Sequence, residues 1–103
     1  MIYAQIDLDG VICQSGKGYV KNNIYQKPMK GALRTIKNIL KQGHKIEILT
    51  SRGPEEWDSV RGWLKKYNFP ELAVTNIKKP ARFYIDNRAI RFINWADIAY
   101  YLL

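Results

Sequence analysis

The chain has 103 residues, of which 47% are apolar and 13% aromatic. This length favours a single domain with its own core, and we expect one domain over residues 1–103. The apolar content argues against a disordered protein, and no apolar run approaches the length of a membrane span, so no membrane partner is expected.

The balance of charged residues is strongly basic. Seventeen Lys and Arg stand against nine Asp and Glu, which gives a formal net charge of +8. Such an excess favours phosphates, nucleic acid or acidic lipid headgroups as partners, although charge that serves only solubility is the plain alternative. No signal peptide is apparent, and the single cysteine, Cys13, fits a reducing cytoplasm.

The first stretch, residues 1–12, is the one that the remaining chain supports. Apolar and polar residues alternate up to Asp7, which predicts a buried strand that ends before Gly10. Asp7 and Asp9 are two residues apart, so in extended chain they point to the same face. Paired carboxylates repel unless a cation bridges them or one holds a proton. A polar turn after a strand is the simpler alternative.

The rest of the chain alternates between predicted helices and strands. Residues 13–30 carry glycine, asparagine and proline without periodicity, which predicts a loop with at most a small hairpin. Gly43 ends the first predicted helix, and Asn68 ends the second, which Pro54 begins. The predicted elements after the loop are a helix over 31–42, strands over 44–49, 72–75 and 82–85, a helix over 54–67, a short edge strand over 89–92 and a last helix over 95–103, capped by Asn94.

This alternation predicts an α/β fold. We expect a single Rossmann-like domain with a mainly parallel sheet of four or five strands flanked by helices. In such sheets the ligand crevice lies at the carboxyl ends of the strands. Functional side chains are therefore expected just after each strand.

Residues suited to phosphoryl transfer follow the predicted strands. Asp7 and Asp9 follow the first, Thr50 and Ser51 the second, and Asp86 the last; Lys78 and Lys79 lie in the loop between the last two. Carboxylates bind Mg²⁺ through oxygen, while a hydroxyl and an ammonium group hold a phosphoryl group. An aspartate can also attack phosphorus to form an aspartyl-phosphate.

Together and in this order, the segments IDLDGVI, ILTSR and YIDNRAIRF resemble the motifs of the haloacid dehalogenase (HAD) superfamily of phosphohydrolases. The resemblance extends from Ile2 to Phe92, nearly the whole chain. It implies a Mg²⁺-dependent phosphatase.

The resemblance also implies a role for each matched residue. Asp7 matches the nucleophile and a metal ligand. Asp9 matches the general acid/base, which also gives its backbone carbonyl to Mg²⁺. Asp86 matches the second carboxylate ligand, so the implied metal set is Asp7, Asp9 and Asp86. Thr50, with Ser51 beside it, matches the phosphoryl-binding hydroxyl, and Lys78 is a better match to the motif lysine than Lys79, which stays an alternative.

Two features depart from the commoner pattern of that family. Asn87 stands where a second acid often follows the terminal aspartate, so weaker metal binding is expected. The gaps between motifs hold no cap domain, since a loop, helices and strands fill them. We expect an open site, as in capless members that act on bulky phosphates.

The remaining chemically distinctive residues have simple interpretations. His44 alone builds no zinc site or triad and is expected at a strand edge on the surface. Cys13 is expected to be packed, and the lysines of the loop to be solvated. Tryptophans and tyrosines are expected in the core and between helices, namely Trp57, Trp63, Trp95, Tyr100 and Tyr101. Any of them that stay exposed would mark a dimer patch or a base-stacking surface.

These expectations give a leading function and an alternative from another class. The leading one is a phosphatase acting on an accessible phosphomonoester, with a nucleotide or a nucleic-acid end favoured by the basic charge. The alternative is a catalytically weak HAD-like module that binds nucleic acid through its basic surface. Turnover of a generic aryl phosphate distinguishes them. The oligomeric state is not predicted.

Overall fold

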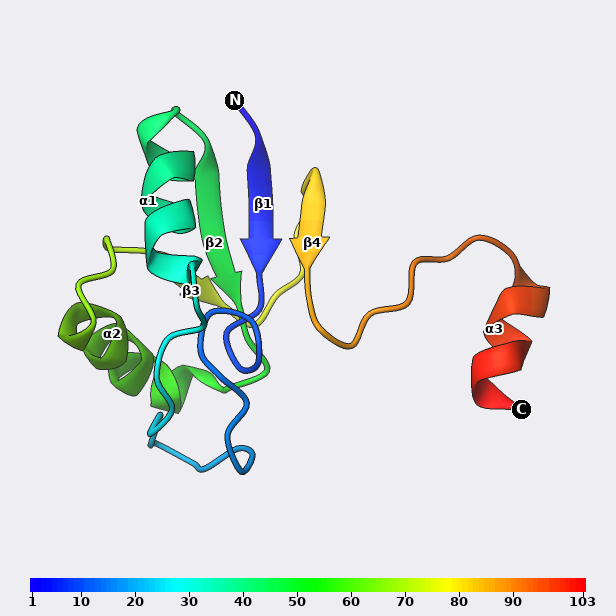
Figure 1. The fold of residues 1–103 in the computed structure, drawn as a ribbon, viewed down its shortest axis with the longest axis horizontal. Coiled ribbons are helices and arrows are strands. Elements are labelled where there is room, and N and C mark those ends of the chain that lie inside the picture. The colour runs from blue at the N-terminus through cyan, green and yellow to red at the C-terminus, as the bar shows by residue number, and fades with distance from the viewer.

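A computed structural model describes all residues from 1 to 103, and Figure 1 shows its fold. The elements, in chain order, are β1 (Tyr3–Ile6), α1 (Ala32–Lys41), β2 (Lys45–Leu49), the 3₁₀ helix η1 (Pro54–Glu56), α2 (Trp57–Lys66), β3 (Ala73–Thr75), β4 (Phe83–Ile85) and α3 (Trp95–Leu102).

The four strands form one parallel sheet in the order β3-β2-β1-β4. Ala4 pairs with Ile46 of β2 on one side and with Phe83 of β4 on the other. Because β1 is central and all strands run the same way, their carboxyl ends meet at one edge of the sheet. The predicted α/β class with a mainly parallel sheet is confirmed.

Local signals in the sequence set the helix ends. Gly31 and Gly43 flank α1 with φ angles of +85° and +87°, a left-handed conformation that favours glycine. Asn68 takes φ +63° just after α2 and ends it, as predicted. None of the three α-helices is long and apolar enough to span a membrane.

One apolar core lies between the helices and one face of the sheet. Ile6, Ile46 and Ile48 point to this face, and Ile36 of α1 and Trp63 of α2 pack in the same buried cluster. Leu8 and Cys13, just past β1, are fully buried there. Cys13 is therefore packed, as expected, and burial raises the pKa of its thiol to about 11.

A buried polar network occupies the opposite face of the sheet. Glu47 accepts hydrogen bonds from Tyr3 Oη at 2.6 Å and Gln5 Nε2 at 3.2 Å, and it pairs with Lys79 Nζ at 3.0 Å. Gln5 also accepts from Lys79 N and donates to Ile77 O, both at 3.0 Å. The β3–β4 connection is thus fixed to the middle of the sheet.

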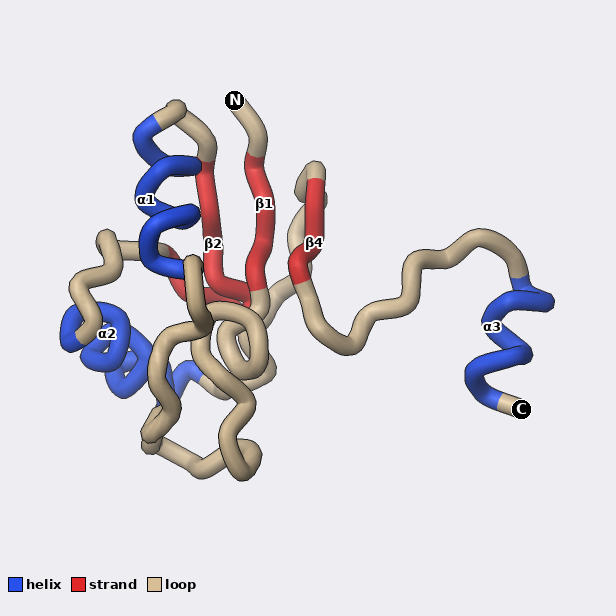
Figure 2. The backbone as a smooth tube through the Cα atoms, in the orientation of Figure 1, coloured by secondary structure: helices blue, strands red, loops and turns tan.

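The C-terminal segment differs from the expectation. No strand forms over 89–92, because the chain turns away after β4 as the Arg88 N–H donates to Asp86 Oδ1 at 2.7 Å. Residues 86–94 contain no helix or strand, and α3 stands apart from the sheet (Figures 1 and 2).

The exposure of α3 corrects part of the prediction about aromatic residues. Trp63 is buried and Trp57 half-buried, as expected. Trp95, Tyr100 and Tyr101 are 75%, 86% and 58% exposed, so the expectation of core positions for them is wrong. The helix itself forms where predicted, since Asn94 Oδ1 accepts from Asp97 N at 2.8 Å.

The network around Glu47 predicts a pH-dependent stability. Burial raises the pKa of Glu47, but hydrogen bonds from Tyr3, Lys79 and Gln5 outweigh burial, so this pKa lies below its ordinary value of 4.5. A pKa that is lower in the folded state stabilises the fold above pH 4.5, and this stabilisation is lost as pH falls through the folded pKa.

Glu47→Gln should therefore lower the free energy of unfolding at neutral pH, with a deficit that shrinks below pH 4.5. Urea unfolding across a pH series measures this deficit, and Glu71→Gln, at an exposed site, is the matched control. A deficit that stays constant with pH would contradict the role given to Glu47.

Candidate active site

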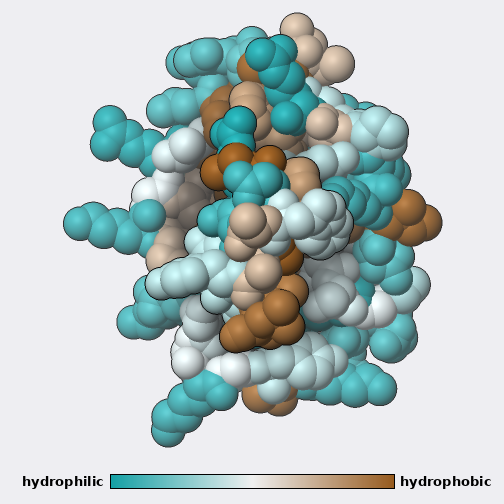
Figure 3. Space-filling model, turned by 90° about the vertical axis from the view of Figure 1, so that its right-hand side faces the viewer, coloured by the Kyte–Doolittle hydropathy of each residue, from teal (hydrophilic) through white to brown (hydrophobic).

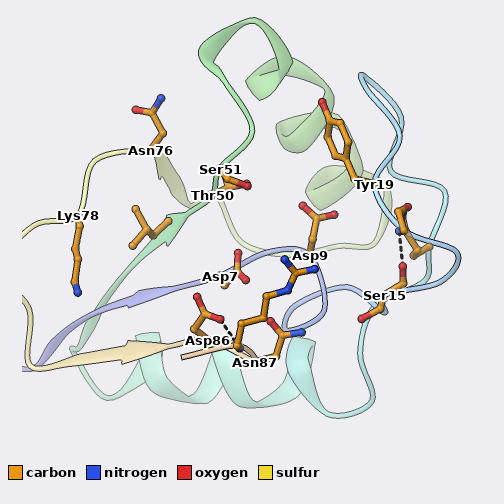
Figure 4. Close-up of a pocket in the computed structure, with 14 residues that line it drawn as sticks. Asp7, Asp9, Ser15, Tyr19, Thr50, Ser51, Asn76, Lys78, Asp86 and Asn87 are labelled. Atoms are coloured by element: carbon orange, nitrogen blue, oxygen red, sulfur yellow. Dashed lines mark hydrogen bonds between the residues drawn. The ribbon is translucent and has the colours of Figure 1, made fainter. Parts of the chain in front are cut away.

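The polar residues that follow the strands meet at one cavity of about 520 Å³ (Figure 4). Asp7 and Asp9 come from the end of β1, Thr50 and Ser51 from the end of β2, Lys78 from the β3–β4 loop and Asp86 from the end of β4. The cavity lining consists of Asp7, Asp9, Ser15, Gly18, Tyr19, Gln26, Leu49, Thr50, Ser51, Asn76, Lys78, Asp86, Asn87 and Arg88. All predicted site residues are therefore brought together.

Asp7 occupies the centre of this group. Its backbone N–H donates to Ile85 O at 2.9 Å, which ties the end of β1 to the end of β4. Burial raises the pKa of the Asp7 carboxyl to about 6; the Leu8 N–H opposes this rise, and the charges of Asp86 and Asp9 add to it. In Figure 4, Asp7 and Asp86 lie close together on the cavity wall.

Asp9 is held by a buried arginine that the sequence analysis did not single out. Arg52 donates from Nε to Asp9 Oδ2 and from Nη2 to Asp9 Oδ1, both at 3.0 Å. It also pairs with Glu56 Oε1 at 3.1 Å and donates to Val20 O at 3.0 Å. The side chain of Arg52 is only 1% exposed. A forked guanidinium that grips both oxygens fixes the Asp9 carboxylate in one orientation.

Glu56 extends this contact into the loop over 13–30. It accepts from Tyr19 Oη at 2.7 Å and from Asn22 N at 2.8 Å. The Arg52 guanidinium also lies 4.6 Å from the centre of the Tyr19 ring. The loop therefore folds over the site as a fixed wall.

Thr50 lines the cavity and is only 2% exposed. Its backbone N–H donates to Thr75 O at 2.9 Å, and its Oγ1 accepts from Arg52 N at 3.2 Å. Because this oxygen acts as an acceptor, its hydroxyl hydrogen stays available for a further acceptor. Ser51, next in the chain, is exposed.

The structure distinguishes the two candidate lysines by position. Lys79 pairs with Glu47 on the polar face of the sheet, and its N–H is bonded to Gln5. Lys78 lines the cavity, with its Nζ 4.4 Å from the centre of the Tyr84 ring. The Gln5 contacts on either side of Lys78 fix the loop that presents it.

The carboxyl ends of β1 and β4 approach each other closely where Gly10 meets Asn87. Gly10 has φ +84°, and a Cβ at this position would lie 2.5 Å from Asn87 Nδ2. Only glycine fits this turn without moving Asn87. Asp86 and Asn87 are thereby brought beside the first turn of the chain.

The oxygen atoms present fit a hard divalent cation, although they form no cluster of three or more acidic, histidine or cysteine side chains. Asp9 directs both carboxylate oxygens to Arg52, whereas Asp7 and Asp86 each keep one carboxylate oxygen without a hydrogen bond that could approach a metal. The chemistry of these donors suits Mg²⁺, which takes one or two carboxylates plus waters and phosphate. Asp7 and Asp86, with the Asp9 backbone carbonyl, would hold it.

The sequence predicted only some of the residues that form the site. Arg52, Tyr19, Gln26, Asn76 and Arg88 were not predicted to belong to it. Arg52 carried a usable signal, because Glu56 follows it by four residues at a helix start. The other four reach the cavity through loop conformations that no periodic pattern indicates.

Comparison of the chain with models of known protein families, with curated proteins and with solved structures finds no match.

The positions of the two lysines lead to a binding prediction. Inorganic phosphate should raise the melting temperature, and Lys78→Met should abolish most of this shift because the free ammonium group is lost. Lys79→Met should lower the melting temperature without phosphate and keep the shift. A thermal melt series with and without phosphate measures both. A shift lost only in Lys79→Met would reverse the assignment.

Proposed function

We propose that this chain is a Mg²⁺-dependent phosphohydrolase that acts on an accessible phosphomonoester through an aspartyl-phosphate intermediate. The observation that carries the proposal is the convergence of Asp7, Asp86, Thr50 and Lys78 on one cavity, from four separate segments. Nucleophile, metal-binding oxygens, hydroxyl and ammonium group are the parts that phosphoryl transfer requires. The resemblance to the HAD superfamily assigns the same roles.

In the first step, a carboxylate oxygen of Asp7 attacks phosphorus. A bond forms between Asp7 and phosphorus as the bond to the leaving oxygen breaks, and Asp9 gives its proton to that oxygen. In the second step, water attacks phosphorus, Asp9 takes a proton from this water, and the bond to Asp7 breaks. Phosphate leaves and both carboxyls return to their starting states.

The contact with Arg52 determines how Asp9 acts. Both Asp9 oxygens accept hydrogen bonds from Arg52, and a carboxylate held in this way suits the base in the second step. For the first step, one oxygen must leave the guanidinium to carry a proton. Glu56 remains paired with Arg52 during this exchange, so the buried arginine keeps a counterion.

Charge neutralisation comes from two sources. Bound Mg²⁺ would screen the negative oxygens of Asp7, Asp86 and the phosphoryl group. Lys78 and the Thr50 hydroxyl would hold the remaining phosphoryl oxygens, with Ser51 beside them. Asn87 contributes an amide in place of a carboxylate, so the metal is expected to bind weakly.

The shape of the site favours a substrate with an exposed phosphate. Besides the ends of the strands and residues 86–88, the loop over 13–30 and the short β3–β4 loop border the cavity, and no inserted domain covers it. Three of the nine acids and two of the seventeen basic residues, Lys78 and Arg88, line the cavity, so fifteen basic side chains elsewhere face only six acids. A nucleotide or an end-phosphorylated nucleic acid would use this excess through its flanking phosphates.

Removal of the nucleophile is the first test. Asp7→Asn should abolish turnover of a small aryl phosphate and retain the fold, because the amide keeps the shape and loses the charge. Asp9→Asn should lower kcat roughly 10²–10⁴-fold, as for loss of a general acid/base. Steady-state kinetics and thermal melts measure both effects. Asp58→Asn, at a fully exposed site, is the control. Wild-type turnover by purified Asp7→Asn would show that Asp7 is not the nucleophile.

The salt dependence of turnover tests the substrate class. If two or three flanking phosphates are engaged, log(kcat/KM) for a single-stranded, end-phosphorylated oligonucleotide should fall against log[salt] with a slope of about −1.5 to −2. A small phosphate ester should give a much shallower slope. Equal slopes for the two substrates, or no cleavage of the oligonucleotide, would argue against nucleic acid and leave the phosphatase proposal intact.

A further inference from the structure

An apolar groove lies beside α1, on the same sheet face as the core. It has a volume of about 180 Å³, and seven of its nine lining residues are apolar. The lining residues are Ile2, Ala4, Ile6, Ile39, His44, Lys45, Ile46, Phe83 and Ile85. Phe83 and Ile85 are 52% and 44% exposed, so the β4 side of this groove has no cover.

The helix α3 has the complementary surface. Trp95, Ile98, Ala99 and Leu102 follow one another at three- and four-residue spacing and form one apolar face. No residue of α3 is buried. Figure 3 views the molecule from the side on which α3 projects and shows hydrophobic surface along the middle of this face. An uncovered face of this kind marks an interaction surface.

The whole chain is more extended than its length requires. Its radius of gyration is 14.7 Å, whereas about 13 Å is typical of a compact domain of this size. The groove and the apolar helix face are both exposed in the same molecule.

The connecting segment allows α3 to reach the groove of its own chain. Ile85 lines the groove, and residues 86–94 follow it directly without helix or strand. Nine extended residues span at most roughly 30–32 Å. This length exceeds the distance from Ile85 to any point along strands of three to five residues, each of which rises about 3.3 Å per residue. No strand or helix must break for α3 to fold back.

Charge and local concentration favour this occupant over a second copy. Two copies of the chain, each with a net charge of +8, repel one another. Because residues 86–94 connect α3 to β4, the effective concentration of α3 at the groove of its own chain is on the order of millimolar.

We propose that the groove between α1 and β4 is the docking surface for α3 of the same chain, which lies over it with the Trp95–Ile98–Leu102 face inward. The arrangement with α3 apart from the sheet is then the undocked form. Docking would cover Phe83 and Ile85 and complete the apolar core on this side of β4.

Cross-linking between engineered cysteines in the full chain tests this. Ile39→Cys places a thiol on the α1 side of the groove, and Phe83→Cys places one on the β4 side. Each is combined with Ile98→Cys on the inward face of α3, or with Tyr100→Cys on the opposite face as the matched control. Native Cys13 is fully buried and does not compete. A short bis-maleimide is added at low micromolar protein, and products are separated by denaturing gel and mapped by mass spectrometry.

The Ile98→Cys pairs should give an intramolecular cross-link at a yield several-fold above that of the Tyr100→Cys pairs. Two anchors keep the test valid if Phe83→Cys does not fold, since Ile39 lines the groove from α1 rather than from β4. Equal yields from the two faces, or no cross-link, would show that α3 does not dock. Predominantly cross-linked dimers would show that α3 occupies the groove of a second copy, and would equally overturn the proposal.

Discussion

The ion pairs of Arg52 are the interaction on which the arrangement of the site depends. This buried guanidinium joins Asp9 from the end of β1, Glu56 from η1 and the carbonyl of Val20 from the loop that borders the cavity. Removing one member of a buried pair costs about 3–5 kcal/mol, because the remaining charge stays in a poorly solvated place. Arg52 thus fixes Asp9, the proposed general acid/base, and the loop that borders the cavity together.

The parallel sheet supplies the second constraint, since four carboxyl ends meet at one edge and bring Asp7, Thr50 and Asp86 together. This much was predictable, because buried strands followed by polar residues are a local pattern and parallel pairing places their ends side by side. The ends of α1 and α2 were predictable for the same reason, as Gly43 and Asn68 act on their immediate neighbours.

The features of the fold and the site that were not predictable depend on contacts between residues far apart in the sequence. The choice of Lys78 over Lys79 rests on Gln5 and Glu47, more than thirty residues away in the chain. The failure of a strand over 89–92 and the exposure of Trp95 follow from the turn at Asp86, which no periodic pattern indicates. That turn also begins the segment that connects β4 to α3.

A trapping experiment tests directly whether Asp7 carries the phosphoryl group during turnover. The protein is mixed with Mg²⁺ and an excess of an aryl phosphate, quenched in acid within the first turnover, and reduced with borohydride, which converts an acyl phosphate to an alcohol. Mass spectrometry of the peptides then locates the modified residue. Modification is expected at Asp7, in proportion to the burst of released phenol. Turnover with an unmodified Asp7, or modification of another residue in its place, would contradict the role of Asp7 as the nucleophile.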